Sequence, residues 1–96
     1  MNRAEKDVFE KALQTYGGEH QQKKLLEEMA ELQKEICKHW DGAQNLDKIA
    51  DEMADVEILL DQMKLLFQNS SLVELRRSFK VDRLYQRIMM REGDSE

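Results

Sequence analysis

The chain has 96 residues, no proline, four glycines and a formal net charge of −5. This length suits a single domain spanning residues 1–96, and the acidic balance argues against a broad nucleic-acid-binding surface. The apolar runs are too short for a membrane span, the charged N-terminal region is unlike a signal peptide, and the single cysteine, Cys37, excludes a disulfide framework. We therefore expect a soluble cytoplasmic protein with no nucleic-acid or membrane partner.

Two predicted helices make up the first part of the chain. The first spans about residues 3–16, with Asn2 as N-cap and Glu5 in the capping-box position. The glycine pair at residues 17–18 ends it. The second spans about residues 19–39, because apolar residues recur there at helical spacing: Leu25, Met29, Leu32 and Ile36.

The third predicted helix, about residues 46–68, has the most regular apolar pattern, and Asn45 is placed to cap its start. Its apolar seam alternates steps of three and four residues: Leu46, Ile49, Met53, Val56, Leu60, Met63 and Phe67. Further apolar residues in its second half fall outside the seam, namely Ile58, Leu59, Leu65 and Leu66. This helix therefore needs more than one partner surface.

The fourth predicted helix, about residues 71–91, begins with a capping box formed by Ser71 and Glu74. Its apolar residues lie on two roughly opposite sides, with Leu72, Leu75 and Phe79 on one and Val81, Leu84, Tyr85 and Ile88 on the other. The sequence therefore predicts an all-α, four-helix bundle-like fold. Because two of its helices are apolar on more than one side, we expect the chain to assemble as an oligomer.

Two related strings place pairs of carboxylates on the second and third predicted helices. Glu28 and Glu31 occur in E-M-A-E, and Glu52 and Asp55 occur in E-M-A-D. Each pair is one helical turn apart on one face, and both pairs flank the apolar stripe on the same side. Antiparallel packing of the two helices, which their short connection requires, would bring the two flanks together.

Carboxylates that converge without a counterion repel one another and raise each other's pKa values. A hard divalent cation removes this repulsion, and Mg²⁺, for which Mn²⁺ can substitute, prefers such oxygen ligands. We interpret Glu28, Glu31, Glu52 and Asp55 as a magnesium site. The competing interpretation is a solvated acidic surface, with the neighbouring Glu35 and Lys48 as further surface charges or as partners of the site.

The two strings, separated by twenty residues, resemble the metal-binding motifs of MazG-like nucleotide pyrophosphohydrolases. This all-α superfamily also contains dimeric dUTPases and phosphoribosyl-ATP pyrophosphohydrolases. The flanking residues are similar to small bacterial and phage members of the family, as in Tyr16-Gly17 and the segments 27–32 and 50–62. The resemblance covers about residues 13–88, which we take as the core of the domain.

The resemblance implies a reaction. Mg²⁺ held by the four carboxylates would bind a nucleoside triphosphate, and water would attack the α-phosphorus to give nucleoside monophosphate and pyrophosphate. We choose Glu31 as the general base. The family also implies nucleotide-pool house-cleaning in a bacterial cell or a phage-infected host, and assembly as a homodimer or homotetramer.

A basic stripe follows the fourth predicted helix: Arg76, Lys80, Arg83, Arg87 and Arg91. Because cationic residues of the last helix are expected to contact the phosphates in this family, we assign Lys80 and Arg83, which are central, to that role. For most of the stripe, a solvated face that balances the acidic helices is the better explanation. Trp40 either stacks on the nucleotide base or covers the end of the bundle, and Cys37 is expected to be a small buried hydrophobe.

Two other functions remain open from the sequence. One is a dUTPase or dCTPase-type enzyme with a narrow base preference. The other is a non-catalytic helical oligomerisation or adaptor module, whose acidic face is solvated or binds a basic partner. The preferred base and sugar do not follow from the sequence.

Overall fold

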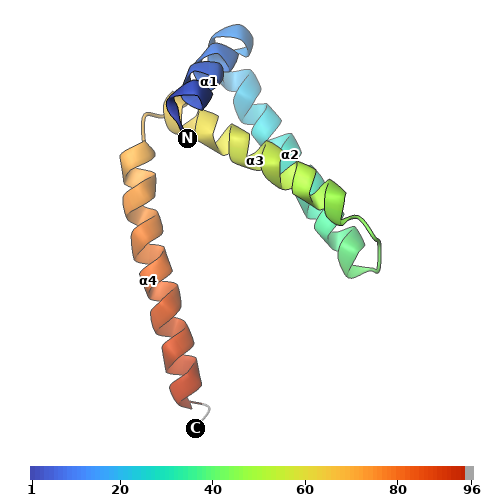
Figure 1. The fold of residues 1–96 in the computed structure, drawn as a ribbon, viewed down its shortest axis with the longest axis vertical. Helices are drawn as coiled ribbons and strands as arrows, with labels where there is room; N and C mark the ends of the chain where they lie inside the picture. Colours follow the sequence, from blue (N-terminus) through green and yellow to red (C-terminus); the bar gives the residue numbers. More distant parts are fainter. Residues whose placement is uncertain (95–96) are drawn as a thin grey trace.

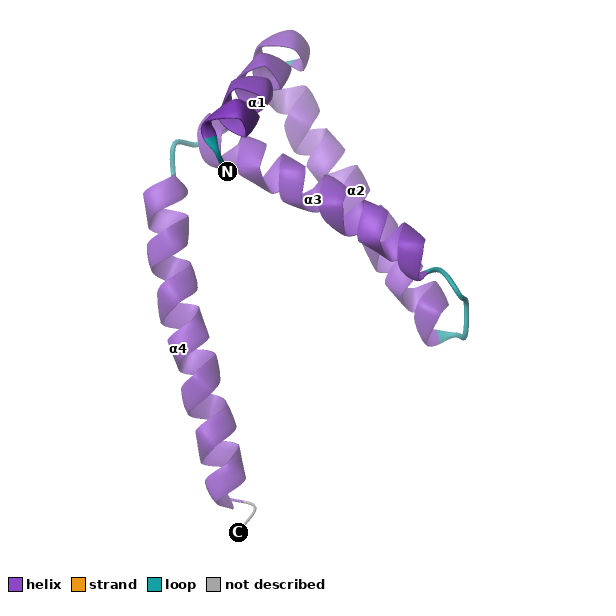
Figure 2. Ribbon diagram, in the orientation of Figure 1, coloured by secondary structure: helices purple, strands orange, loops and turns teal. Residues whose placement is uncertain are grey.

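The computed structural model describes residues 1–94, and the side chains of residues 1–91. Its helices are α1 (Arg3–Tyr16), α2 (Gly18–Trp40), α3 (Leu46–Leu66) and α4 (Ser70–Asp94), and residues 1–94 contain no strand (Figures 1 and 2). The predicted all-α class is confirmed, and no predicted helix end is wrong by more than three residues. None of the helices in this range has the length and apolar character needed to cross a membrane.

The predicted boundary signals around α1 are confirmed. The Asn2 side chain accepts a hydrogen bond from the Glu5 N–H, and the Glu5 carboxylate accepts one from the Asn2 N–H, both at 2.8 Å. At the other end Gly17 has a φ of +89°, a conformation that residues with a Cβ rarely adopt. Its N–H donates to the Leu13 carbonyl at 2.9 Å, which closes α1 and lets α2 begin at Gly18.

One predicted cap, Ser71, is wrong, and another, Asn45, has the predicted position without a capping bond. Asn45 occupies the N-cap position of α3, but its side chain makes no capping bond and donates instead to Glu35 on α2. α4 begins at Ser70, one residue before the predicted start, so Ser71 lies inside the helix and is not its N-cap. The connection before α4 includes Gln68 with a φ of +51°, a left-handed residue that redirects the chain after α3.

The helices form a hairpin with one helix across its end and another extending away from it. α2 and α3 run antiparallel, and α1 lies against the end where α2 begins and α3 finishes (Figure 1). Within the described residues α4 contacts α3 but neither α1 nor α2. A single chain therefore packs three helices together and leaves the fourth almost free, so any four-helix arrangement around α4 requires further chains.

The hydrophobic core is small for a chain of this length. Its buried apolar residues are Phe9, Leu59 and Met63. Leu59 lies outside the predicted seam of α3, whereas the seam residues Met53, Leu60 and Phe67 are 44–54% exposed. Cys37 is also exposed, so its prediction as a buried residue is wrong. These four residues, Met53, Leu60, Phe67 and Cys37, are exposed for the same reason. α2 and α3 pack against each other through one side only, and no other described part of the chain covers the apolar side next to it.

The dimensions of the chain agree with this open arrangement. Its radius of gyration is 17.1 Å, whereas a compact domain of this length has a radius of about 12–13 Å. Its accessible surface is 8030 Å², whereas a compact monomer of 11.4 kDa exposes about 5,800 Å². The excess, about 2,200 Å² per chain, is comparable to the area that one chain loses in a large obligate interface.

Candidate metal centre

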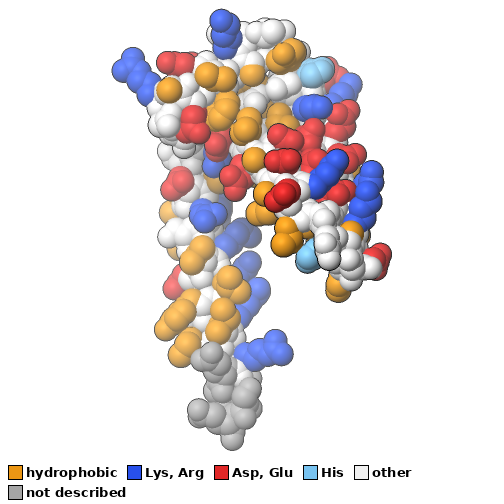
Figure 3. Space-filling view, turned by 45° about the vertical axis from the view of Figure 1, so that its right-hand side comes forward, with side chains coloured by type: hydrophobic (Ala, Val, Ile, Leu, Met, Phe, Trp, Pro, Cys, Tyr) orange, Lys and Arg blue, Asp and Glu red, His pale blue; other side chains and the backbone are white. Residues whose placement is uncertain are grey.

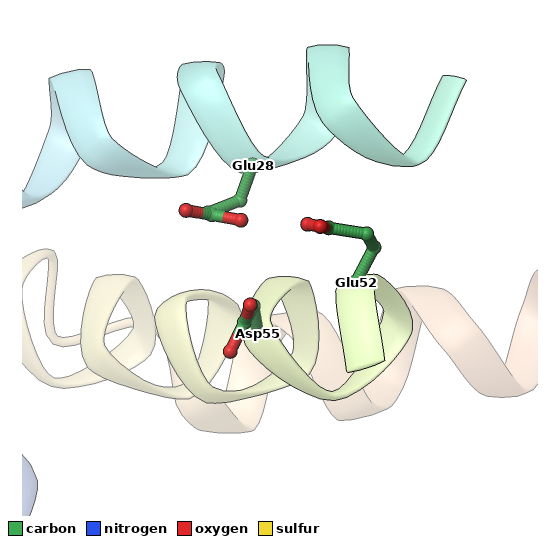
Figure 4. Close-up of side chains that lie close together, drawn as sticks. All are labelled: Glu28, Glu52 and Asp55. Atoms are coloured by element: carbon green, nitrogen blue, oxygen red, sulfur yellow. The ribbon is translucent and has the colours of Figure 1, made fainter. Parts of the chain in front are cut away.

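The antiparallel hairpin brings together three of the four predicted carboxylates. Glu28 points from α2 toward α3, and Glu52 and Asp55 reach into the same space from successive turns of α3 (Figure 4). One carboxylate oxygen from each residue lies within 4.8 Å of the others. We call Glu28, Glu52 and Asp55 the carboxylate triad. Glu28 and Glu52 are half-buried and Asp55 is exposed, so the triad is open to solvent on the Asp55 side.

Within the described part of the chain, no ion pair joins the triad to a cation on the facing helix. Among the described residues, the one ion pair of the triad joins Glu28 to Lys24 on the same helix, at 3.4 Å between Nζ and Oε1. A hydrogen bond with Glu28 is the main cause that raises the pKa of Lys24, followed by the negative charges of Glu28 and Glu27. Lys24 is shared with Glu27 at 3.7 Å, so it offsets only part of the local negative charge.

Of the three triad residues, Glu52 shows most clearly that a positively charged partner is missing. Its pKa is raised first by hydrogen bonding with Glu28 and then by burial. The negative charges of Glu28, Asp55 and Glu31 raise it further. The Oε2 atom of Glu52 is buried and accepts no hydrogen bond from an N–H or hydroxyl group of the described residues. Because buried polar atoms nearly always have a partner, this atom points to a ligand.

Hydrogen-bonded polar pairs lie on both sides of the triad along the α2–α3 contact. At one end Gln21 of α2 donates through Nε2 to Oε1 of Gln62 on α3 at 2.8 Å, and both side chains are buried. At the other end Asn45 donates to the backbone carbonyl of Glu35 at 2.9 Å and to its carboxylate at 3.2 Å. Two of these three layers contain a buried oxygen with no hydrogen-bond partner among the described residues: Oε2 of Glu52 in the triad and Oδ1 of Asn45. Of the three layers, the triad is the one that brings three carboxylates together.

Glu35 behaves as a structural carboxylate, unlike Glu52. It is 3% exposed, and the hydrogen bond from Asn45 is the main cause that lowers its pKa, with Lys38 and Lys48 also favouring the charged form. Its carboxylate lies 3.4 Å from Lys38. Glu35 is thus held ionised by donors and cations. The sequence leaves Lys48 as either a surface charge or a partner of the site. In the structure its positive charge favours the ionised form of Glu35, in the polar layer next to the triad.

The triad fits a hard divalent cation in the type of its ligands. All three groups offer carboxylate oxygens, the ligands that Mg²⁺ and Ca²⁺ prefer. Two oxygens on opposite sides of Mg²⁺ lie about 4.2 Å apart, because each bond is about 2.1 Å long. Three ligands of one octahedral ion cannot all lie opposite one another, and neighbouring ligand oxygens are only about 3.0 Å apart. The triad oxygens, which all lie within 4.8 Å of one another, would therefore have to move closer together to bind one Mg²⁺ ion.

Glu31, the fourth predicted ligand and the predicted general base, lies outside the triad. Its side chain is 48% exposed and its Oε2 atom is 4.0 Å from Nζ of Lys34. It is nevertheless close enough for its charge to help raise the pKa of Glu52. The structure therefore places Glu31 beside the triad, as a charged neighbour with a free side toward solvent.

The residues predicted to contact the substrate lie apart from the triad within one chain. Lys80 and Arg83 are exposed on α4, which makes no contact with α2 in the described part of the chain. In Figure 3 the Lys and Arg side chains of α4 project on the side that faces the α2–α3 arm, over which Asp and Glu side chains gather. Trp40 is 88% exposed at the end of α2, so it does not cover the end of a bundle in this chain. It lines an apolar groove of α2 and α3 together with Met29, Leu32, Gln33, Ile36, Cys37 and Val56.

No family model, curated protein or solved structure matches the chain. The candidate site consequently rests on the geometry of the chain itself. Sequence reasoning missed the buried glutamines, Gln21 and Gln62, and the partnership of Asn45 with Glu35. One signal pointed to them: polar residues recur every seven positions on α2, at Gln21, Glu28 and Glu35, and on the same side of the helix.

Proposed function

We propose that the chain is a magnesium-dependent nucleotide pyrophosphohydrolase of the MazG-like type, which converts (d)NTP and water into (d)NMP and pyrophosphate. The observation that carries the proposal is the partnerless, buried Oε2 atom of Glu52 within the carboxylate triad. A cation at the triad would satisfy that oxygen and remove the repulsion that raises the pKa of Glu52. The sequence resemblance supplies the substrate class.

The proposed reaction needs little from the protein beyond holding and orienting groups. The triad would hold the ion, which supplies neutralisation of phosphate charge and a lower pKa for water at the site. Water attacks the α-phosphorus, the bond from that phosphorus to the bridging oxygen breaks, and pyrophosphate leaves. Glu31 accepts the proton of the water. Its position beside the triad supports this role, because its carboxylate is not committed to the cluster.

We also propose that the working form is a homodimer or homotetramer. The support is the excess accessible surface, the half-exposed apolar residues of α2 and α3, and the isolation of α4 within the chain. In such an assembly Lys80 and Arg83 would reach the phosphates of a nucleotide held at the triad of another subunit. Trp40 would lie near an interface, where its indole can stack on a base.

The direct test is pyrophosphate release from a panel of nucleoside triphosphates, with Mg²⁺, Mn²⁺ or Ca²⁺ and with EDTA. We expect hydrolysis with Mg²⁺ or Mn²⁺ and none with EDTA. Activity restricted to dUTP or dCTP would support the narrow-specificity alternative. If no nucleotide is cleaved under any condition, the chain is not this enzyme, and the adaptor alternative gains support.

Two matched substitutions distinguish the loss of a triad ligand from the loss of a nearby negative charge. Glu28→Gln removes a triad ligand, and Glu27→Gln removes the adjacent acidic charge, which shares the same partner, Lys24. We expect Glu28→Gln to lower the rate on the order of a hundredfold or more, because neutralisation of the phosphate charge is lost. Glu27→Gln is expected to stay within about twofold, because its carboxylate is exposed and outside the triad. Equal effects of the two substitutions would contradict the assignment of the triad.

A further inference from the structure

The contact between α2 and α3 contains buried polar side chains where an apolar residue would be the ordinary choice. Gln21 and Gln62 are 6% and 4% exposed, and they meet through a hydrogen bond of 2.8 Å. The ring of His20 lies 2.8 Å from the other side of the Gln21 amide, at its Oε1 atom. A buried amide pair contributes little to stability compared with an apolar pair of equal volume, so its presence calls for another reason.

The position of the pair along the hairpin suggests that reason. Gln21 precedes Glu28 by seven residues on α2, and Gln62 follows Asp55 by seven residues on α3. Seven residues of helix span about 10 Å, so the amide pair lies two turns from the triad on the same side of both helices. The hydrogen bond forms in the same antiparallel register that places Glu28 against Asp55 and Glu52.

Apolar contacts do not select a register by themselves. Burial of apolar area is non-directional, and the apolar residues next to the triad tolerate sliding or rotation of one helix against the other. The triad favours such a movement, because its like charges repel one another. A hydrogen bond between buried amides is directional, and sliding would leave the Nε2 donor of Gln21 and the Oε1 acceptor of Gln62 without each other.

We propose that Gln21 and Gln62 are positioning residues, which hold α2 and α3 in the one register that assembles the carboxylate triad for cation binding. The inference rests on the proposed cation site but requires no particular substrate. Its prediction differs from that of a purely structural pair. Loss of the amide pair weakens Mg²⁺ binding even where the stability of the fold is preserved.

The test uses methionine, which matches glutamine in length but makes no directional hydrogen bond. Gln21→Met and Gln62→Met are made singly and together, and the exposed neighbour Gln22→Met is the matched control. Thermal unfolding in EDTA reports stability, and calorimetric titration with Mg²⁺ reports affinity. Each single variant leaves the donor or acceptor of the remaining glutamine unpaired and lowers the melting temperature, whereas the double variant recovers it.

In the double variant the melting temperature is expected to recover, but the Mg²⁺ affinity is not. We expect the double variant to bind Mg²⁺ about tenfold more weakly than wild type, as for other residues that orient metal ligands, and Gln22→Met to bind as wild type does. A double variant that is stable and binds Mg²⁺ within twofold of wild type would overturn the proposal. If the methionine pair fails to fold, a leucine pair takes its place; if that also fails, the glutamines serve stability alone and the inference is wrong. Wild-type protein that binds no Mg²⁺ would instead refute the cation site on which the inference depends.

Discussion

At the scale of single residues, two buried or half-buried glutamates on the same hairpin show opposite electrostatic behaviour. The pKa of Glu35 is lowered mainly by the hydrogen bond from Asn45, and the pKa of Glu52 is raised mainly by its hydrogen bond with Glu28. Both are acidic residues on the inner side of amphipathic helices, and nothing in their own sequence distinguishes them. The difference comes mainly from the groups across the hairpin, Asn45 for Glu35 and Glu28 for Glu52, and same-helix neighbours such as Lys38 and Asp55 add to it.

This contrast predicts a pH dependence of stability. Because the pKa of Glu52 is raised above 4.5 in the folded protein, the folded state keeps a proton that the unfolded chain has released. The free energy of unfolding should therefore fall as the pH rises from 4.5 through the raised pKa, and remain lower at neutral pH. Glu35, with its lowered pKa, acts in the other direction, losing stability as the pH falls below 4.5.

Chemical denaturation in EDTA at a series of pH values above 4.5 measures the contribution of Glu52. We expect Glu52→Gln to flatten the pH dependence, because the amide does not ionise, and saturating Mg²⁺ to raise wild-type stability most at neutral pH. An unchanged slope in Glu52→Gln would show that another group is responsible. A slope of opposite sign in the wild type would contradict the raised pKa itself.

At the scale of the helices, the sequence predicted the parts that depend on local pattern. The capping box at Asn2, the break at Gly17 and the antiparallel approach of Glu28 to Asp55 all follow from spacing along the chain. The role of Asn45 did not follow, because its hydrogen-bond partner lies ten residues earlier on the facing helix. Local preference favours a cap at such a position, and a contact between helices prevailed over it.

The Asn45 side chain is accordingly expected to stabilise the α2–α3 connection more than the start of α3. Asn45→Ala removes the donor from the Glu35 carbonyl, and we expect it to lower the free energy of unfolding by about 1–2 kcal/mol. Asn45→Asp, which is an equally good N-cap but presents no N–H, should be no better than alanine. If aspartate restores wild-type stability in urea denaturation, then Asn45 acts as a cap after all.

At the scale of the whole molecule, the separation of α4 from the hairpin was beyond sequence analysis. The apolar pattern of α3 and α4 indicated that these helices need several partner surfaces. It could not indicate whether the partners belong to the same chain. Within one chain, the left-handed backbone conformation of Gln68 turns α4 away from α1 and α2, so α4 does not supply the missing partner surfaces of those helices. Within one chain, this arrangement keeps the basic residues of α4 apart from the acidic residues of α2 and α3, which a compact bundle would bring together.

One experiment can test both whether the chain assembles and whether Lys80 and Arg83 serve the triad of another subunit. Light scattering at micromolar concentration should give a dimer or tetramer. Chains carrying Glu52→Gln are then mixed and reassembled with chains carrying both Lys80→Ala and Arg83→Ala. Each variant alone should lose at least about a hundredfold in rate, because it lacks either a triad ligand or both phosphate-binding cations.

If α4 serves the triad of another subunit, half of the dimers in an equal mixture combine the two variants, and one of their two sites is intact. The mixture should then recover about a quarter of wild-type activity. No recovery would mean that α4 serves its own hairpin or no site at all. A well-folded monomer in light scattering would contradict assembly directly.

The exposure of Trp40 has a practical consequence. It is the only tryptophan of the chain, it is 88% exposed, and it borders the apolar groove of α2 and α3. Its indole emission therefore comes from a single, known place and should have the long-wavelength maximum of a hydrated ring. Any event that covers the groove would displace water from that ring and shift the emission to the blue. The wild-type chain thus contains its own optical reporter, which follows events at this groove by dilution or titration without an added label.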